Sequence, residues 1–91
     1  MRYSIDWDPD ILREFTTFWE QLPKVQQRIV MDTLDDTDRM LKSDPWAVGE
    51  SRHTDSVRVI ISLPLVLTYH IDNRLSIVRV VDAKVYWKKD R

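Results

Sequence analysis

Apolar and polar residues alternate at the start of the chain and then change to a helical period. Tyr3, Ile5 and Trp7 alternate with polar residues, which predicts a strand with one buried face. Asp8 then offers a side-chain oxygen for helix capping, and Pro9 suits the first helical position. The sequence therefore predicts a strand over 3–7 followed at once by a helix.

The segment 9–43 carries two apolar stripes at helical spacing. The first stripe is formed by Ile11, Leu12, Phe15, Phe18, Trp19 and Leu22. Pro23 opens a second helix, whose stripe consists of Val30, Leu34, Thr37 and Leu41. Asp44-Pro45 ends this helix, because the residue before proline avoids the helical region. The pattern predicts a hairpin of two helices with their apolar side chains in the core, Phe18 included.

The last part of the chain returns to the strand period. Residues 45–56 predict the longest loop, in which the only glycine, Gly49, is expected to have a positive φ. Apolar residues alternate over 57–63 until Pro64 breaks the run. Strands over 65–71 and 75–81 complete a meander, and a short tail over 85–91 follows.

Two registers are compatible with the last hairpin. A loop at Asn73-Arg74 pairs Tyr69 with Val78 and sets Thr68 opposite Arg79, and it separates apolar from polar residues better than a loop at Asp72-Asn73. We therefore predict the first register.

The element order β-α-α-β-β-β predicts a two-layer α+β fold, an antiparallel sheet with a helix hairpin packed on one face. Two helices leave the second face of the sheet uncovered. The residues predicted on that face are Arg58, Ile60, Ser62, Val66, Thr68, His70, Ile77 and Arg79. This face is either the solvated side of the sheet or the working surface of the protein.

Composition limits the functional classes. With 91 residues and 43% hydrophobic content, the chain forms a single domain over 1–91. Fourteen basic against fifteen acidic residues give no overall basic field for nucleic acid or anionic membrane. The absence of cysteine excludes disulfides, thiolate nucleophiles and thiolate metal sites. No run is apolar and long enough to span a membrane, and the expected location is the cytoplasm.

Several segments, in this order, resemble the RelE/ParE superfamily of toxins from bacterial toxin-antitoxin operons. They are "DILREFTTFWEQLPKVQQRI", "DPWAVG", "VRVIISLPLVLTYHID" and the closing "KVY". The resemblance covers essentially the whole chain. It implies a cytosolic toxin bound by a cognate antitoxin. It also implies one of two targets, ribosome-bound messenger RNA or DNA gyrase.

The resemblance carries over to two site residues and departs at two places. Tyr86 matches the tyrosine near the C-terminus of messenger-cleaving members, and Arg58 matches the arginine after the loop. Asp82 stands where an arginine commonly precedes that tyrosine, and Leu65-Val66 replaces a "YR" pair. Both departures remove positive charge from the sheet face that would meet phosphate.

RNA cleavage through the 2′-hydroxyl needs a base, an acid and cations around the phosphate. His70 can act as acid or base, Arg58 and Arg79 can stabilise charge, and Tyr86 can stack on a base or share in proton transfer. The basic residues Lys84, Lys88, Lys89 and Arg91 can bind RNA or an acidic antitoxin.

Structural interpretations of the same residues have equal standing. His70 can be simply solvated, Arg79 can pair with an acidic neighbour, and Arg58 can tether the loop over 50–55. The two histidines lack metal-ligand spacing, so no metal or cofactor is expected. Trp46 and Trp87 either pack locally or anchor a partner.

Three functional hypotheses follow. The first is a RelE/ParE-like toxin, acting as a metal-independent, ribosome-dependent endoribonuclease or by binding a target such as gyrase. The second is a non-catalytic interaction domain that has kept the scaffold and lost the arginines. The third is a homodimer that buries the sheet face through Ile60, Val66, Ile77 and Val81.

Overall fold

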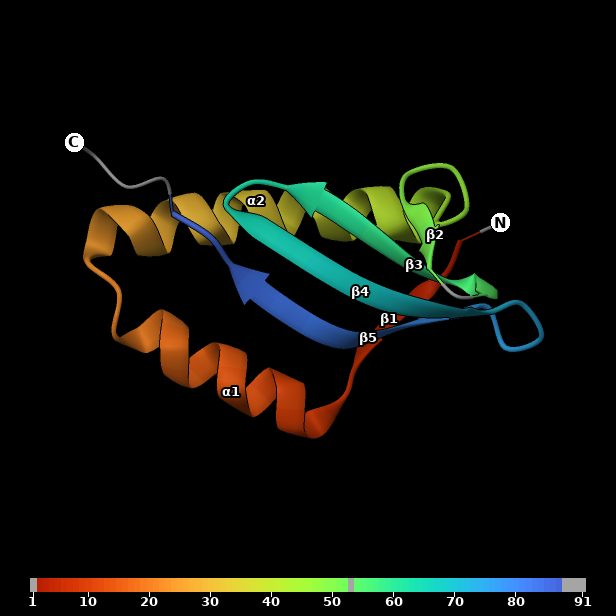
Figure 1. Cartoon of the computed structure of the whole chain (residues 1–91), viewed down its shortest axis with the longest axis horizontal. Coiled ribbons are helices and arrows are strands. Elements are labelled where there is room, and N and C mark those ends of the chain that lie inside the picture. The colour runs from red at the N-terminus through yellow and green to blue at the C-terminus, as the bar shows by residue number, and fades with distance from the viewer. Residues whose placement is uncertain (1, 53, 88–91) are drawn as a thin grey trace.

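A computed structural model describes residues 2–52 and 54–87 of the chain. In chain order the elements are β1 (Ser4–Trp7), α1 (Pro9–Glu20), α2 (Lys24–Ser43), β2 (Glu50–Arg52), β3 (Thr54–Ser62), β4 (Leu65–Asp72) and β5 (Ile77–Val85). Within these residues the strands form one mixed sheet in the order β1-β5-β4-β3-β2, with the helices on one face (Figure 1). The predicted α+β class and helix hairpin are confirmed.

The helix boundaries follow from the capping residues that the sequence indicated. The carboxylate of Asp8 accepts hydrogen bonds from the backbone N–H groups of Asp10 and Ile11, at 2.9 and 3.3 Å. Pro23 occupies the N-cap of α2, and Asp44 is its C-cap directly before Pro45. These predictions are confirmed. No helix in the described ranges has the length and apolarity needed to cross a bilayer.

The sheet contains more strand than the sequence predicted. β2 and the start of β3 lie in the segment expected to be a loop, and β5 continues to Val85. β1 runs parallel to β5, so the sheet is not purely antiparallel. The short β2–β3 pairing was not predicted because residues 50–56 are polar. Backbone hydrogen bonds can form this pairing without an alternating apolar face.

The predicted faces of β3 are wrong. Arg58, Ile60 and Ser62 pair with Tyr69, Leu67 and Leu65, all of which face the helices. Apolar residues occupy both faces of this strand, so alternation alone does not fix which face is buried. Ile60 is a core residue, whereas Ile61 is exposed.

The hairpin register also differs from both registers considered. The loop spans 73–76, and Asp72 pairs with Ile77, Tyr69 with Val80 and His70 with Arg79. The carboxylate of Asp72 accepts from the N–H of Leu75 at 3.1 Å, which stabilises the wider turn. Because the observed register differs by two residues from the predicted one, the predicted faces of Thr68, His70 and Arg79 are preserved.

A β-bulge divides β5. Tyr69 pairs with Val80 but Thr68 pairs with Asp82, so Val81 is the extra residue. Before the bulge Val78 and Val80 face the helices, and after it Ala83 and Val85 do so.

The face opposite the helices, here called the open face, is defined by paired strand positions. Its members are Ser4, Asp6, Glu50, Val57, Val59, Ile61, Val66, Thr68, His70, Asp72, Ile77, Arg79, Asp82 and Lys84.

The core lies between the helices and the sheet. The helices contribute Phe15, Val30, Thr37 and Leu41, and the sheet contributes Ile60, Leu65, Leu67, Tyr69, Ile71, Val78 and Val80. The stripe of α1 is wider than its buried face, since Leu12 and Phe18 are 47% and 45% exposed. The expectation that Phe18 is a core residue is therefore wrong.

Candidate functional site

Arg58 lies on the helix side of the sheet, not on the open face where it was predicted. Its Nη2 donates to the carbonyl oxygen of Gly49 at 2.6 Å, and its guanidinium carbon lies 5.8 Å from the ring centroid of Trp46. A cation over an aromatic face is a stabilising contact. Arg58 thus tethers the segment around Gly49, which agrees with the structural interpretation of this residue.

Tyr69 explains the glycine at position 49. Its hydroxyl donates to the carbonyl oxygen of Pro45 at 2.8 Å, and a β-carbon on Gly49 would lie 2.2 Å from the hydroxyl oxygen. The expectation of a positive φ at Gly49 is wrong, because Gly49 does not have one. Burial raises the pKa of Tyr69 above its ordinary value, and the positive charge of Arg58 partly opposes this rise.

His70 and Arg79 lie directly opposite each other on the open face. Together with Asp72 and Ile77 they line a small pocket of about 120 Å³. The Nε and Nη2 atoms of Arg79 lie 3.1 and 3.0 Å from one carboxylate oxygen of Asp6, its neighbour on β1. Arg79 therefore pairs with an acidic neighbour, and any anion must compete with Asp6 for its guanidinium group.

Tyr86 lies at the opposite end of the open face from His70. Its N–H donates to the carbonyl oxygen of Pro64 at 2.7 Å, so it lies beside the start of β4. His70 lies six steps along the chain from Pro64, so the backbones of Tyr86 and His70 are about 20 Å apart at about 3.3 Å per residue. Lys84 is on the same face, with its Nζ 3.9 Å from a carboxylate oxygen of Asp82. The four candidate catalytic residues therefore do not meet at one point.

The two unexplained tryptophans have different surroundings. Trp46 packs within the fold, since its Nε1 donates to the side-chain oxygen of Asn73 in the hairpin turn at 3.0 Å. Trp87 lines an apolar pocket with Leu63, Pro64 and Tyr86, and its buried Nε1 has no hydrogen-bond partner among residues 2–52 and 54–87. The predicted basic residues Lys88, Lys89 and Arg91 lie outside the described residues.

The open face has more negative than positive charge. Among its described members Arg79 and Lys84 are the cations, and the carboxylates are Glu50, Asp6, Asp72 and Asp82. Two cations against four carboxylates make a poor surface for a phosphodiester chain, whose binding depends on neutralising phosphates with Lys and Arg.

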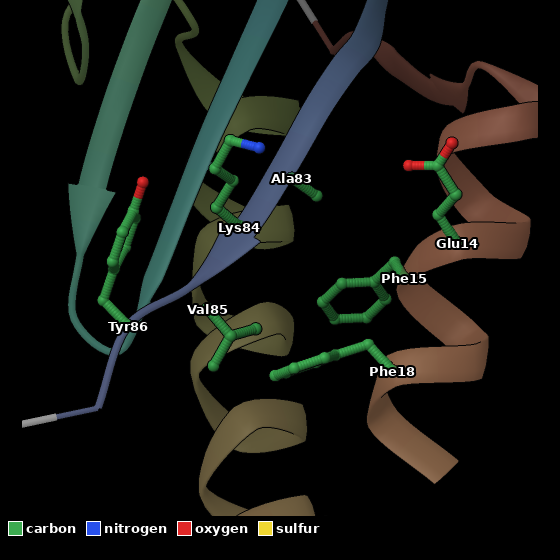
Figure 2. Close-up of a pocket in the computed structure, with 7 residues that line it drawn as sticks. All are labelled: Glu14, Phe15, Phe18, Ala83, Lys84, Val85 and Tyr86. Atoms are coloured by element: carbon green, nitrogen blue, oxygen red, sulfur yellow. The ribbon is translucent and has the colours of Figure 1, made fainter. Parts of the chain in front are cut away.

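A groove between α1 and β5 was not predicted. Phe15 and Phe18 point from α1 toward Ala83 and Val85 of β5 (Figure 2), and a space of about 270 Å³ lies between them. The available signal was the width of the apolar stripe of α1, because five apolar positions on a twelve-residue helix exceed one buried face.

Comparison with known proteins gives similarity in structure alone. No known family and no curated protein matches the sequence. The RelBE2 toxin-antitoxin complex of Mycobacterium tuberculosis matches with a TM-score of 0.67 and 17% identity, over 93% of this chain and 99% of that one.

Two E. coli structures are similar to the same degree. A RelE mutant bound to a peptide of the antitoxin RelB has a TM-score of 0.68 and 20% identity, over 98% of this chain and 87% of that chain. The same mutant in the free state has a TM-score of 0.67 and 18% identity, over 93% and 84%. The chain has the RelE fold.

Proposed function

We propose that this protein is the toxin component of a bacterial toxin-antitoxin pair and that a cognate antitoxin binds it. The support is the RelE fold over almost the whole chain, together with the fact that two of the similar structures are complexes with an antitoxin or its peptide. The cytoplasm is the compartment in which such a toxin would meet its target.

The toxin acts by binding a protein target, for which DNA gyrase is the candidate that the family resemblance implies. The observation that carries this proposal is the separation of the candidate catalytic residues. An RNase needs its acid, base and cations around one phosphate. Here Arg58 lies on the helix side of the sheet, the backbones of Tyr86 and His70 are about 20 Å apart by strand geometry, and Asp6 pairs with Arg79. The charge of the open face also favours a protein over RNA.

A ribosome-dependent endoribonuclease is the second candidate, and one observation favours it. His70 and Arg79 face each other across a strand pair beside a small pocket. In that activity His70 would transfer a proton, Arg79 would stabilise the phosphate and Tyr86 would stack on a base. This activity would need the ribosome to bring the phosphate to His70, because the chain alone does not bring His70, Arg79 and Tyr86 together around one point.

The test is to induce this chain alone in a bacterial host and to follow colony-forming units and messenger integrity together. Binding to a protein target predicts growth arrest with intact messenger. Arrest with rapid messenger loss that His70→Ala and Arg79→Ala both abolish would establish the endoribonuclease instead. Arg74→Ala is the matched control, because Arg74 is exposed in the hairpin turn and is outside the candidate set.

An absence of growth arrest from a folded, abundant chain would refute the toxin proposal. It would favour the non-catalytic interaction domain, and the acidic residue at Asp82 would then be one reason for the lost activity. Circular dichroism and soluble yield of each variant separate loss of folding from loss of function.

A further inference from the structure

A pocket lies where β1, α1 and α2 meet, on the flank of α1 that faces away from the groove beside β5. Its volume is about 310 Å³. Three aromatic rings line it, those of Trp7 at the end of β1 and of Phe15 and Trp19 on α1. The other lining residues are Leu12 and Thr16 of α1 and Met31 and Leu34 of α2.

Contacts within the fold hold the aromatic walls in place. The Nε1 of Trp19 donates to the carbonyl oxygen of Gln27 at 3.1 Å, and the Nε2 of Gln27 donates to the carbonyl oxygen of Trp19 at 3.0 Å. The rings of Trp7 and Phe15 pack against each other, with 5.3 Å between their centroids and 49° between their planes. Walls that are fixed before a ligand enters lose little side-chain freedom when it binds.

The lining selects a neutral, aromatic ligand. Among the described residues that line the pocket none is charged, and an unpaired charge is costly to remove from water. Trp19 offers its ring to a ligand, because its Nε1 already donates to Gln27. Pairs of aromatic rings contribute more than their buried area alone, so an aromatic ligand is favoured over an aliphatic one of equal size.

Thr16 supplies a hydrogen-bond acceptor. Its hydroxyl donates to the carbonyl oxygen of Leu12 at 2.7 Å. A hydroxyl group has one proton and two acceptor lone pairs. Because the proton is already used within α1, Thr16 can only accept from a ligand. The complementary ligand therefore carries an N–H or O–H group.

The volume sets the size of the ligand. An apolar protein cavity of about 150 Å³ binds benzene, a single ring. A pocket of about 310 Å³ therefore has room for two fused rings. A partner helix, about 10–12 Å across with its side chains, could enter this space only by spreading α1 and α2 apart.

We propose that this pocket binds a neutral, free aromatic molecule of two fused rings with a single N–H or O–H group, which donates to the Oγ1 of Thr16. Indole is the simplest member of this class. The proposal goes beyond the proposed function and does not rest on it.

The probes are indole and indene, which share the same two fused rings and differ in that indene has a methylene group in place of the N–H. At millimolar concentration indole should shift the side-chain N–H NMR signals of Trp7 and Trp19. The signals of Trp46 and Trp87, which do not line the pocket, should stay in place. Indene should bind with a dissociation constant about 2- to 10-fold larger, because it lacks the hydrogen bond to Thr16.

Variants locate the contact. Thr16→Val keeps the shape of the side chain and removes the acceptor, so the dissociation constants of indole and indene should become equal. Leu12→Ser removes an apolar contact and should weaken the binding of both probes about 3- to 10-fold. Phe18→Ser is its matched control, because Phe18 lies on the same helix at similar exposure (45% against 47%) but outside the pocket, and it should leave binding unchanged.

Equal shifts of all four tryptophan signals, or no binding of indole up to its solubility, would overturn the proposal. A preference for indole over indene that persists in Thr16→Val would also overturn it. So would shifts of the Trp7 and Trp19 signals on dilution of the free protein together with a dimer mass in sedimentation, which would place a second copy in the pocket. Circular dichroism of each variant separates lost binding from lost folding.

Discussion

The hydroxyl group of Tyr69 occupies the space that a side chain at position 49 would need, with 2.2 Å between its oxygen and a β-carbon built on Gly49. Gly49→Ala should therefore lower the free energy of unfolding by about 1–3 kcal/mol, the usual cost of overpacking. Urea denaturation of the wild type and the variant measures this difference in the free energy of unfolding. In the Tyr69→Phe background the cost of Gly49→Ala should shrink, and an unchanged cost would show that Tyr69 is not the obstacle.

Tyr69 should make stability fall at alkaline pH. Burial raises its pKa in the folded chain above the ordinary 10.0, so the unfolded chain loses this proton first as the pH rises. The stabilisation is fully present below pH 10.0 and is lost as the pH rises through the folded-state value. The slope contributed is at most about 1.4 kcal/mol per pH unit. Unfolding from pH 8 to 11 should show this slope in the wild type and not in Tyr69→Phe.

Substitution of Arg58 should lower the stability of the fold, and it should change activity only through that loss of stability. Arg58→Met removes a charged hydrogen bond to Gly49 and a contact with Trp46, and should cost about 1–3 kcal/mol of the free energy of unfolding. The growth arrest expected from the proposed function should fall only in proportion to the folded fraction. Loss of toxicity at unchanged melting temperature and yield would instead assign Arg58 a direct role.

The ion pair between Arg79 and Asp6 should contribute little stability, because both side chains are more than half exposed. Asp6→Asn should lower the free energy of unfolding by at most about 1 kcal/mol. The difference should shrink in 1 M NaCl, where the screening length is about 3 Å. Denaturation at low and high salt is the measurement, and a salt-independent loss above about 2 kcal/mol would contradict it.

Asn73 should hold the hairpin turn to two segments that are distant in the sequence. Its side-chain oxygen accepts from the hydroxyl of Tyr3 at 2.7 Å and from Nε1 of Trp46 at 3.0 Å. Asn73→Ala should lower the free energy of unfolding by about 1–3 kcal/mol, since it removes two hydrogen bonds that contribute about 0.5–1.5 kcal/mol each. The exposed neighbour Arg74 is the control, and Arg74→Ala should change stability by less than about 0.5 kcal/mol.

The helices were predictable because their signals are local. A capping carboxylate at Asp8 and prolines at positions 9, 23 and 45 act on the residues beside them, and the structure begins and ends its helices there. The parallel pairing of β1 with β5 was not predictable in this way, since it joins residues more than 70 positions apart and depends on how the hairpin packs.

The sequence predicted the sheet face of most candidate site residues, but it did not predict which of them lie close together. His70 and Arg79 lie on the open face as expected, because alternation in β4 and around Arg79 is strong. Arg58 was assigned to the wrong face because Ile60 and Ile61 are both apolar. The contacts of Arg58 with Gly49 and Trp46 determine its face, and the sequence does not show them. The groove beside Phe18 depends on how far α1 lies from β5, which no pattern of residues encodes directly.

The extra residue at Val81 acts like a frameshift in the pattern of side chains along β5. Before it the even-numbered valines, Val78 and Val80, face the helices, and after it the odd-numbered Ala83 and Val85 do. Deleting this one residue would turn Asp82 and Lys84 toward the apolar layer and Ala83 and Val85 toward solvent. The single extra residue therefore keeps the apolar residues of both halves of β5 on the helix side, and it keeps Asp82 and Lys84 on the open face.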